Sequence, residues 1–283
     1  MSEFLEALSR HAFLQNAIAA GLLAGVACGV IGTYVVVKRI VFISGGIAHT
    51  VLGGMGIAYF LGAAPMYGAV IAAIVAALII GLVSLKANQR EDTLIGALWA
   101  FGMAIGVLFI SRTPGYNVDL MSYLFGNILL VPRRDVVGIL VLDAAILTIV
   151  LLLSKRLLAV CYDEEFARLQ GVRVSGLYLL LLCLIALTVV ILVQVVGIVL
   201  VIALLTLPAA IAGHYARSLT QMMILAAALG SLLTIGGLAV SYQPDLPPGA
   251  TIIVLASVAY LLSLFVRALL NRRRRRQTPQ PAE

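Results

Sequence analysis

Apolar stretches of about 18 to 25 residues alternate with short clusters of charge along this sequence, and a helix needs about 20 apolar residues to cross a bilayer. Transmembrane spans are expected at 13–37, 43–62, 66–86, 93–111, 135–154, 175–194, 196–213, 219–241 and 250–270. The total is nine, or eight if 43–62 or 196–213 does not cross fully. A further apolar piece at 118–131 is too short to cross. The sequence therefore predicts an all-α, polytopic transmembrane helical bundle.

Composition excludes an ordinary soluble domain. Hydrophobic residues make up 63% of the chain and charged residues 11%, against about 25% charged in a typical soluble domain. The net charge of +7 does not indicate nucleic-acid binding. The largest basic run, 272–276, directly follows an apolar span, where it sets topology and meets lipid headgroups. The three cysteines lack metal-ligand spacing, and no disulfide is expected.

The charge clusters also predict the organisation of the chain. A polar segment at 1–12 without a basic signal-peptide region precedes a transmembrane domain at 13–270. That domain contains a cytoplasmic loop at 155–174, and a basic cytoplasmic tail follows at 271–283. With the tail inside, the positive-inside rule places most basic clusters in the cytoplasm and the N-terminus outside. The arginines of region 112–134 fall on the opposite side.

The span 43–62 contains five glycines, at positions 45, 46, 53, 54 and 56. Each weakens a helix by about 1 kcal/mol relative to alanine. Two interpretations remain open: an interface where helix backbones approach closely, or an unwound functional segment.

Two ionisable residues lie within predicted spans. His49 belongs to the glycine-rich span, where it either faces a cavity or a metal ion, or bonds to a neighbouring carbonyl. Asp143 lies within 135–154 and either pairs with a basic group or faces a water-filled path.

The loop 156–174 contains an acidic cluster followed by apolar residues and Gly171. Acidic residues favour a helix start and glycine favours a helix end, so a short cytoplasmic helix is predicted. It either docks a soluble partner or rests on the membrane surface. The chain shows no phosphate-binding loop of a nucleotide-hydrolysing domain, so we expect any energy source to lie in another subunit.

The sequence resembles the membrane permease subunits of bacterial ABC importers for zinc, manganese and iron. The resemblance covers about 13–270 and is carried by six stretches in order: KRIVFISGGIAHTVLGGMGIAYFLG (38–62), EDTLIGALWAFGMAIG (91–106), VDLMSYLFGNIL (118–129), DEEFARLQGVRV (163–174), VGIVLVIALLTLPAAIAGHYARS (196–218) and DLPPGATIIVL (245–255).

The resemblance implies a role for several residues. The segment DEEFARLQG resembles the helix that couples the permease to its ATPase, with candidate residues Asp163, Glu164, Glu165, Phe166, Ala167, Leu169 and Gly171. His49 matches the family histidine near the metal path. The family usually has an aspartate four residues earlier, where this chain has Gly45. Asp119 and Asp245 match positions near the outer mouth, where negative charge would concentrate cations.

The resemblance also implies the function. It predicts a transport subunit without enzymatic activity or bound cofactor, in the bacterial cytoplasmic (inner) membrane. The cargo would be a divalent cation, zinc first, then manganese, then iron. Expected partners are an ATP-binding subunit, an extracytoplasmic metal-binding protein and a second permease copy. Alternatives are a permease for metal chelates or cobalamin-like solutes, an ion-coupled secondary transporter, and a membrane scaffold that does not transport.

Overall fold

The computed structural model describes residues 2–86, 91–113 and 126–277, and the regular structure within them is entirely helical. The elements are α1 (Ser2–Arg10), α2 (Ala12–Val37), α3 (Val41–Phe60), α4 (Pro65–Lys86), α5 (Glu91–Arg112), the 3₁₀ turn η1 (Ile128–Leu130), α7 (Arg133–Tyr162), α8 (Glu164–Leu169), α9 (Val174–Val196), α10 (Ile198–Tyr215), α11 (Leu219–Tyr242) and α12 (Pro248–Gln277). Within the described ranges, nine helices are long and apolar enough to cross a membrane. The predicted fold class is confirmed, with nine candidate spans rather than eight.

The boundaries of the spans differ from the prediction mainly at α7. This helix continues to Tyr162, so the first part of the expected loop 155–174 is helical. The prediction ended this helix at 154, where charged residues begin. A helix can nevertheless extend beyond the bilayer, because water solvates its polar side chains there. The polar segment 1–12 also contains a helix, α1. The described part of 118–131 shows only the short turn η1.

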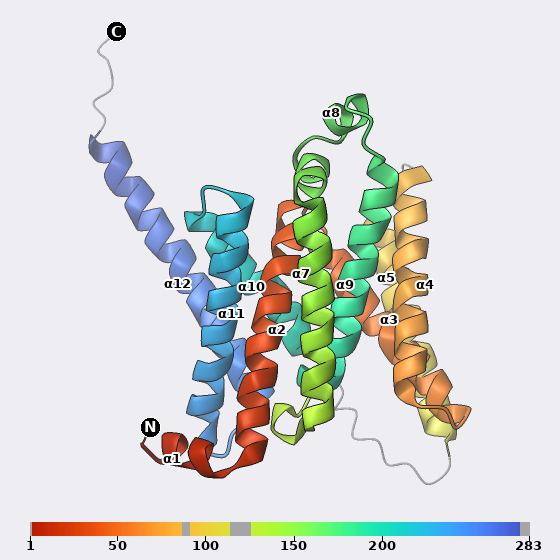
Figure 1. The fold of residues 1–283 in the computed structure, drawn as a ribbon, viewed down its shortest axis with the longest axis vertical. Helices are drawn as coiled ribbons and strands as arrows, with labels where there is room; N and C mark the ends of the chain where they lie inside the picture. The colour runs from red at the N-terminus through yellow and green to blue at the C-terminus, as the bar shows by residue number, and fades with distance from the viewer. Residues whose placement is uncertain (1, 87–90, 114–125, 278–283) are drawn as a thin grey trace.

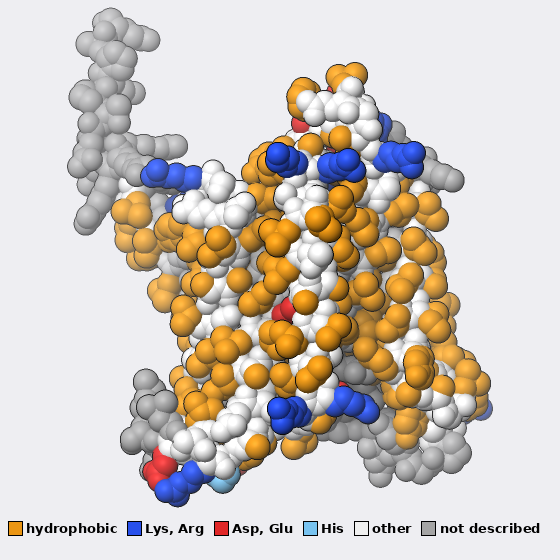
Figure 2. All heavy atoms as spheres, in the orientation of Figure 1, with side chains coloured by type: hydrophobic (Ala, Val, Ile, Leu, Met, Phe, Trp, Pro, Cys, Tyr) orange, Lys and Arg blue, Asp and Glu red, His pale blue; other side chains and the backbone are white. Residues whose placement is uncertain are grey.

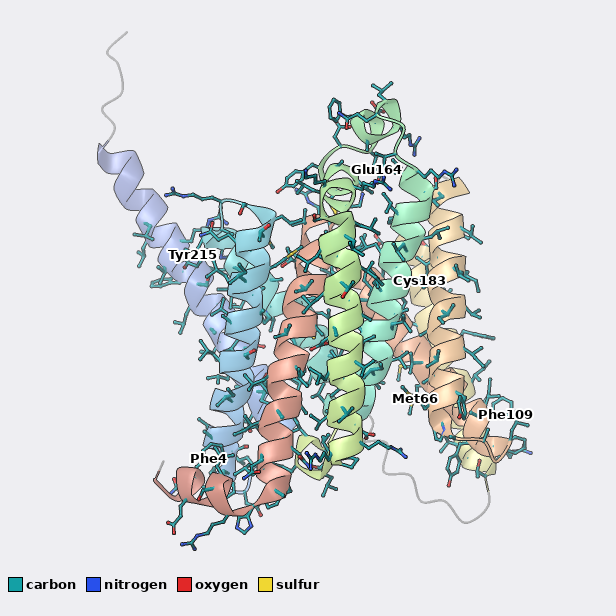
Figure 3. All side chains as sticks on the ribbon, viewed as in Figure 1. Phe4, Met66, Phe109, Glu164, Cys183 and Tyr215 are labelled. Atoms are coloured by element: carbon teal, nitrogen blue, oxygen red, sulfur yellow. The ribbon has the colours of Figure 1, made fainter. Side chains whose placement is uncertain are left out.

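The spans run up and down between two ends of the bundle (Figure 1). At one end, which we call the α8 end, Lys38 at the end of α2 contacts Glu164 of α8, and the turn between α10 and α11 lies beside Tyr162. At the opposite end, Phe4 of α1 packs edge-on against Tyr242 of α11. Figure 3 shows Glu164 and Tyr215 near the α8 end and Phe4 and Phe109 near the opposite end.

The Lys and Arg side chains on the visible face of the molecule lie near its two ends. Figure 2 shows hydrophobic side chains covering the middle, with Lys and Arg side chains bordering this apolar belt above and below. The predicted cytoplasmic clusters at 38–39, 155–173 and 217 share the α8 end, whereas Arg133 and Arg134 begin α7 at the other end. This arrangement is the one that the charge pattern predicted. Which end faces the cytoplasm stays a prediction.

The glycines of α3 serve close packing. Helix α3 is continuous from Val41 to Phe60 and packs against α4 and α5. A Cβ atom added to Gly54 would lie 2.2 Å from the carbonyl oxygen of Gly68 in α4. One added to Gly53 would lie 2.7 Å from the carbonyl oxygen of Gly102 in α5. The structure therefore supports the interpretation as a tight interface, because only glycine permits such approaches.

Alanine at Gly54 should separate α3 from α4 and destabilise the protein by about 1–3 kcal/mol, the usual range for overpacking. Thermal unfolding of the purified protein in detergent measures the effect. Gly96→Ala is the matched control, since nothing lies within 4 Å of its added Cβ. Equal unfolding temperatures for the two variants would contradict the assignment.

Candidate functional site

His49 lies inside the bundle in contact with Trp99. Its side chain on α3 is 7% exposed, and its ring stacks on Trp99 of α5 with centroids 4.1 Å apart and planes 10° apart. The indole nitrogen of Trp99 donates to the sulfur of Met103, at 3.3 Å. His49 Nδ1 is buried without a hydrogen-bond partner among the described residues. Buried polar atoms are normally paired, so Nδ1 is a candidate contact for a solute.

The surroundings of His49 offer few ligands for a metal ion. A Cβ atom at Gly45 would lie 3.7 Å from the Trp99 ring and 4.0 Å from Ile202 of α10, both ordinary contact distances. Packing therefore does not require glycine at this position, unlike at Gly53 and Gly54. Within the described ranges, no three His, Cys, Asp or Glu side chains are grouped to hold a metal ion.

Asp143 forms a second buried polar position, on α7. It is 3% exposed, and neither carboxylate oxygen has a hydrogen-bond partner among the described residues. The ion pair considered for it is therefore not formed within the described ranges. Its helix packs against α2 and α9, whereas α3, which carries His49, packs mainly against α4 and α5. The structure does not bring the two ionisable groups together in a relay.

The structure describes only one of the two aspartates predicted at the outer mouth. Asp245 lies in the turn between α11 and α12, at the end opposite α8, and it is exposed with a left-handed backbone (φ +52°). Asp119 lies outside the described residues. Their suggested role stays a prediction.

Helix α8 is short but has well-defined ends. Asp163 caps its start, because its Oδ1 accepts a hydrogen bond from the backbone N–H of Phe166 at 2.9 Å. Such a cap contributes about 1 kcal/mol. Gly171 ends the helix with φ +75°. The backbone N–H groups of Gly171 and Val172 donate to the carbonyls of Arg168 and Ala167, the glycine-ended pattern common at helix C-termini.

The two faces of α8 differ. Ala167 is fully buried and packs with Val160, Val172 and Val174. Phe166 is 52% exposed and Leu169 is 86% exposed, and Glu165 is also exposed. An exposed aromatic ring and an exposed leucine on a charged helix beyond the apolar belt form a candidate docking surface.

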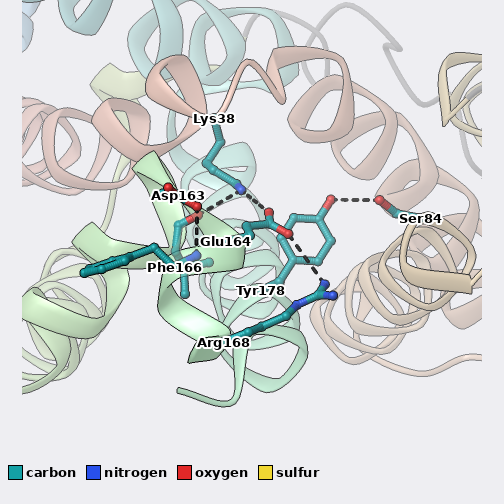
Figure 4. Close-up of polar contacts among 8 residues, drawn as sticks. Lys38, Ser84, Asp163, Glu164, Phe166, Arg168 and Tyr178 are labelled. Atoms are coloured by element: carbon teal, nitrogen blue, oxygen red, sulfur yellow. Dashed lines mark hydrogen bonds and ion pairs between the residues drawn. The ribbon is translucent and has the colours of Figure 1, made fainter. Parts of the chain in front are cut away.

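Lys38 connects α8 to the transmembrane helices (Figure 4). Its ammonium group donates to a carboxylate oxygen of Glu164 and to the carbonyl of Val160, the latter at 3.1 Å. It also lies 5.8 Å from the centroid of the Tyr178 ring of α9, within cation–π range. The hydroxyl groups of Tyr178 and Ser84 of α4 are 3.3 Å apart. Five helices, α2, α4, α7, α8 and α9, are thereby linked at one end of the bundle.

The sequence did not predict the contact that Lys38 makes with α8. Glu164 is 126 positions away along the chain, so no local pattern pairs the two.

Comparison with known proteins identifies the family. The model of the family described as "ABC 3 transport family" matches residues 10–267. The chain belongs to the ABC 3 transport family.

Several proteins with similar sequences are named as transport proteins. A probable metal transport system membrane protein of Chlamydia pneumoniae is 42% identical, with 98% of this chain and 97% of that protein covered. The manganese transport system membrane protein MntC of Halalkalibacterium halodurans is 37% identical, with 93% and 90% covered. The structure of PsaBC from Streptococcus pneumoniae in complex with Fab matches with a TM-score of 0.85 and 32% identity, covering 94% of this chain and 95% of the other. The predicted family is confirmed: metal transport permeases, among which manganese is the metal named.

Loss of the Lys38–Glu164 ion pair should loosen α8 without unfolding the bundle. Lys38→Met or Glu164→Gln should each speed amide hydrogen exchange in 164–169 by about fivefold, equivalent to about 1 kcal/mol for a partly exposed ion pair. The double variant should exchange no faster than either single variant, because both remove the same contact. Arg168→Gln is the control, since its contact with Glu164 is 3.9 Å long and exposed. Additive effects would contradict the link.

Proposed function

We propose that this chain is the membrane permease of an ATP-driven importer for a divalent metal cation, with manganese as the first candidate cargo. The observation that carries the proposal is the capped helix α8 in a chain of this family. It projects beyond the apolar belt with Phe166 and Leu169 exposed. The names of the relatives favour manganese. The resemblance seen in the sequence had placed zinc first.

In this proposal a separate ATP-binding subunit docks on α8. Phe166 and Leu169 supply the apolar contact, as buried aromatic and aliphatic anchors do in protein interfaces. Their displacement reaches the spans through the buried Ala167 and through Lys38, which joins α8 to the end of α2. The α8 end is therefore the cytoplasmic end, and the C-terminus lies in the cytoplasm.

Two further parts of the proposal concern the cargo. The metal is delivered by an extracytoplasmic metal-binding protein at the opposite end, near Asp245, and crosses a path between two permease copies. His49 contacts it on the way through its unpartnered Nδ1. An ion-coupled secondary transporter is less well supported, because His49 and Asp143 lie on helices without extensive mutual packing.

Serine at both Phe166 and Leu169 should weaken binding of the ATP-binding subunit at least tenfold, a loss of about 1.4 kcal/mol. Both side chains are exposed, so the permease should still fold and insert. Co-purification of the two subunits measures the effect. Leu130→Ser, an exposed leucine (77%) at the opposite end, is the matched control. Undiminished co-purification would refute the docking role of α8.

Alanine at His49 should reduce uptake of limiting manganese about tenfold, with unchanged protein in the membrane, because a contact worth about 1.4 kcal/mol is lost. Uptake of radioactive manganese by cells carrying the complete importer measures this. His11→Ala, at an exposed histidine before α2, should leave uptake unchanged. Normal uptake by the His49 variant would assign His49 to packing alone.

A further inference from the structure

A pocket lies beside α8 and has no part in the proposed path of the metal. It has a volume of about 490 Å³ and lies between the end of α7, the residues that follow α8, and the start of α9. Its lining is Arg156, Gln170, Gly171, Val172, Arg173, Gly176 and Leu177. The pocket therefore lies where two transmembrane helices meet the C-terminal end of α8.

The pocket carries two arginines without a counter-charge. Arg156 comes from α7 and Arg173 directly precedes α9, and both are exposed. Neither forms an ion pair with any residue of the described chain. The nearby acidic side chain of Glu164 already contacts Lys38 and Arg168, and Asp163 caps α8. Two free guanidinium groups at one pocket favour an anionic ligand with several oxygens, as phosphate has.

The position of the pocket indicates where such a phosphate comes from. Towards the middle of α7, Leu151 is 72% exposed and Leu152 is 79% exposed, as expected for side chains that face lipid tails. Figure 2 shows Lys and Arg side chains between this apolar belt and the projecting top of the molecule. Basic pockets at the membrane surface between transmembrane helices bind anionic lipid headgroups.

The two glycines of the lining border unoccupied space. A Cβ atom at Gly171 or Gly176 would meet nothing within 4 Å. The opening at Gly176 is not needed for helix packing, in contrast to the close approaches of α3.

We propose that this pocket binds the phosphate headgroup of an anionic phospholipid, with Arg156 and Arg173 on the phosphate and the acyl chains along the exposed leucines of α7. The site is separate from the docking surface at Phe166 and Leu169. It does not depend on the proposed transport function, because lipid binding is measured without cargo.

The test is a titration of the purified full-length protein with phosphatidylglycerol and, separately, phosphatidylcholine, followed by native mass spectrometry. The parent should bind one phosphatidylglycerol in preference to phosphatidylcholine. The double variant Arg156→Gln, Arg173→Gln should lose about 25-fold in affinity for phosphatidylglycerol, since each basic group contributes about fivefold. Lys155→Gln removes one positive charge, as each single arginine substitution does, from an exposed neighbour outside the pocket lining, and it should bind as the parent does.

A second pair of variants tests the space without altering charge. Gly176→Phe should fill the pocket and reduce phosphatidylglycerol binding, with unfolding temperature unchanged. Gly138→Phe, at an exposed glycine of α7 with nothing within 4 Å of its added Cβ, should not affect it. Binding that survives both the double arginine variant and Gly176→Phe would overturn the proposal.

Two further results would also overturn it. Displacement of phosphatidylglycerol by millimolar inorganic phosphate would show a site for the soluble anion. Loss of the ATP-binding subunit from the double arginine variant, with phosphatidylglycerol binding unchanged, would show that the arginines contact acidic groups of that subunit.

Discussion

The fold depends on satisfying backbone hydrogen bonds where no water is available. Within hydrocarbon, each helix must pair its own N–H and C=O groups. Polar side chains follow the same requirement: Thr33, Thr188 and Thr234 each donate to a carbonyl four residues earlier in their own helix. Against this background His49 and Asp143 stand out, because their buried atoms lack partners among the described residues. Unsatisfied polar groups are costly, so these two positions are where function is to be sought.

The parts of the structure that sequence could predict are those fixed by nearby residues. The spans follow from the length of each apolar stretch, and α8 follows from Asp163 at its start and Gly171 at its end. For the glycines of 43–62, close packing was one of two open interpretations, and the sequence did not show that Gly68 and Gly102 would be the opposing residues. The extension of α7 to Tyr162 was missed because a charged pair was taken to end the helix.

Contacts between distant segments could not be predicted in this way. Lys38 contacts Glu164, 126 positions later in the chain, and His49 stacks on Trp99 from another span. Both are products of how the helices assemble, and one sequence contains no signal that pairs them. The site was thus only partly predicted from sequence: its histidine was identified, whereas the stacking of Trp99 on it was not.

The close packing of α3 against α4 and α5 has a mechanical consequence. Backbones that meet through glycine have no intervening side chains whose rotamers could change to allow sliding. We therefore expect α3, α4 and α5 to move as one rigid block, with His49 and Trp99 keeping their relative placement within it. Any change between open and closed forms would then be concentrated at the borders of that block. One such border includes α9 and α10, which are joined through the single residue Gly197 at φ +80°, a natural pivot.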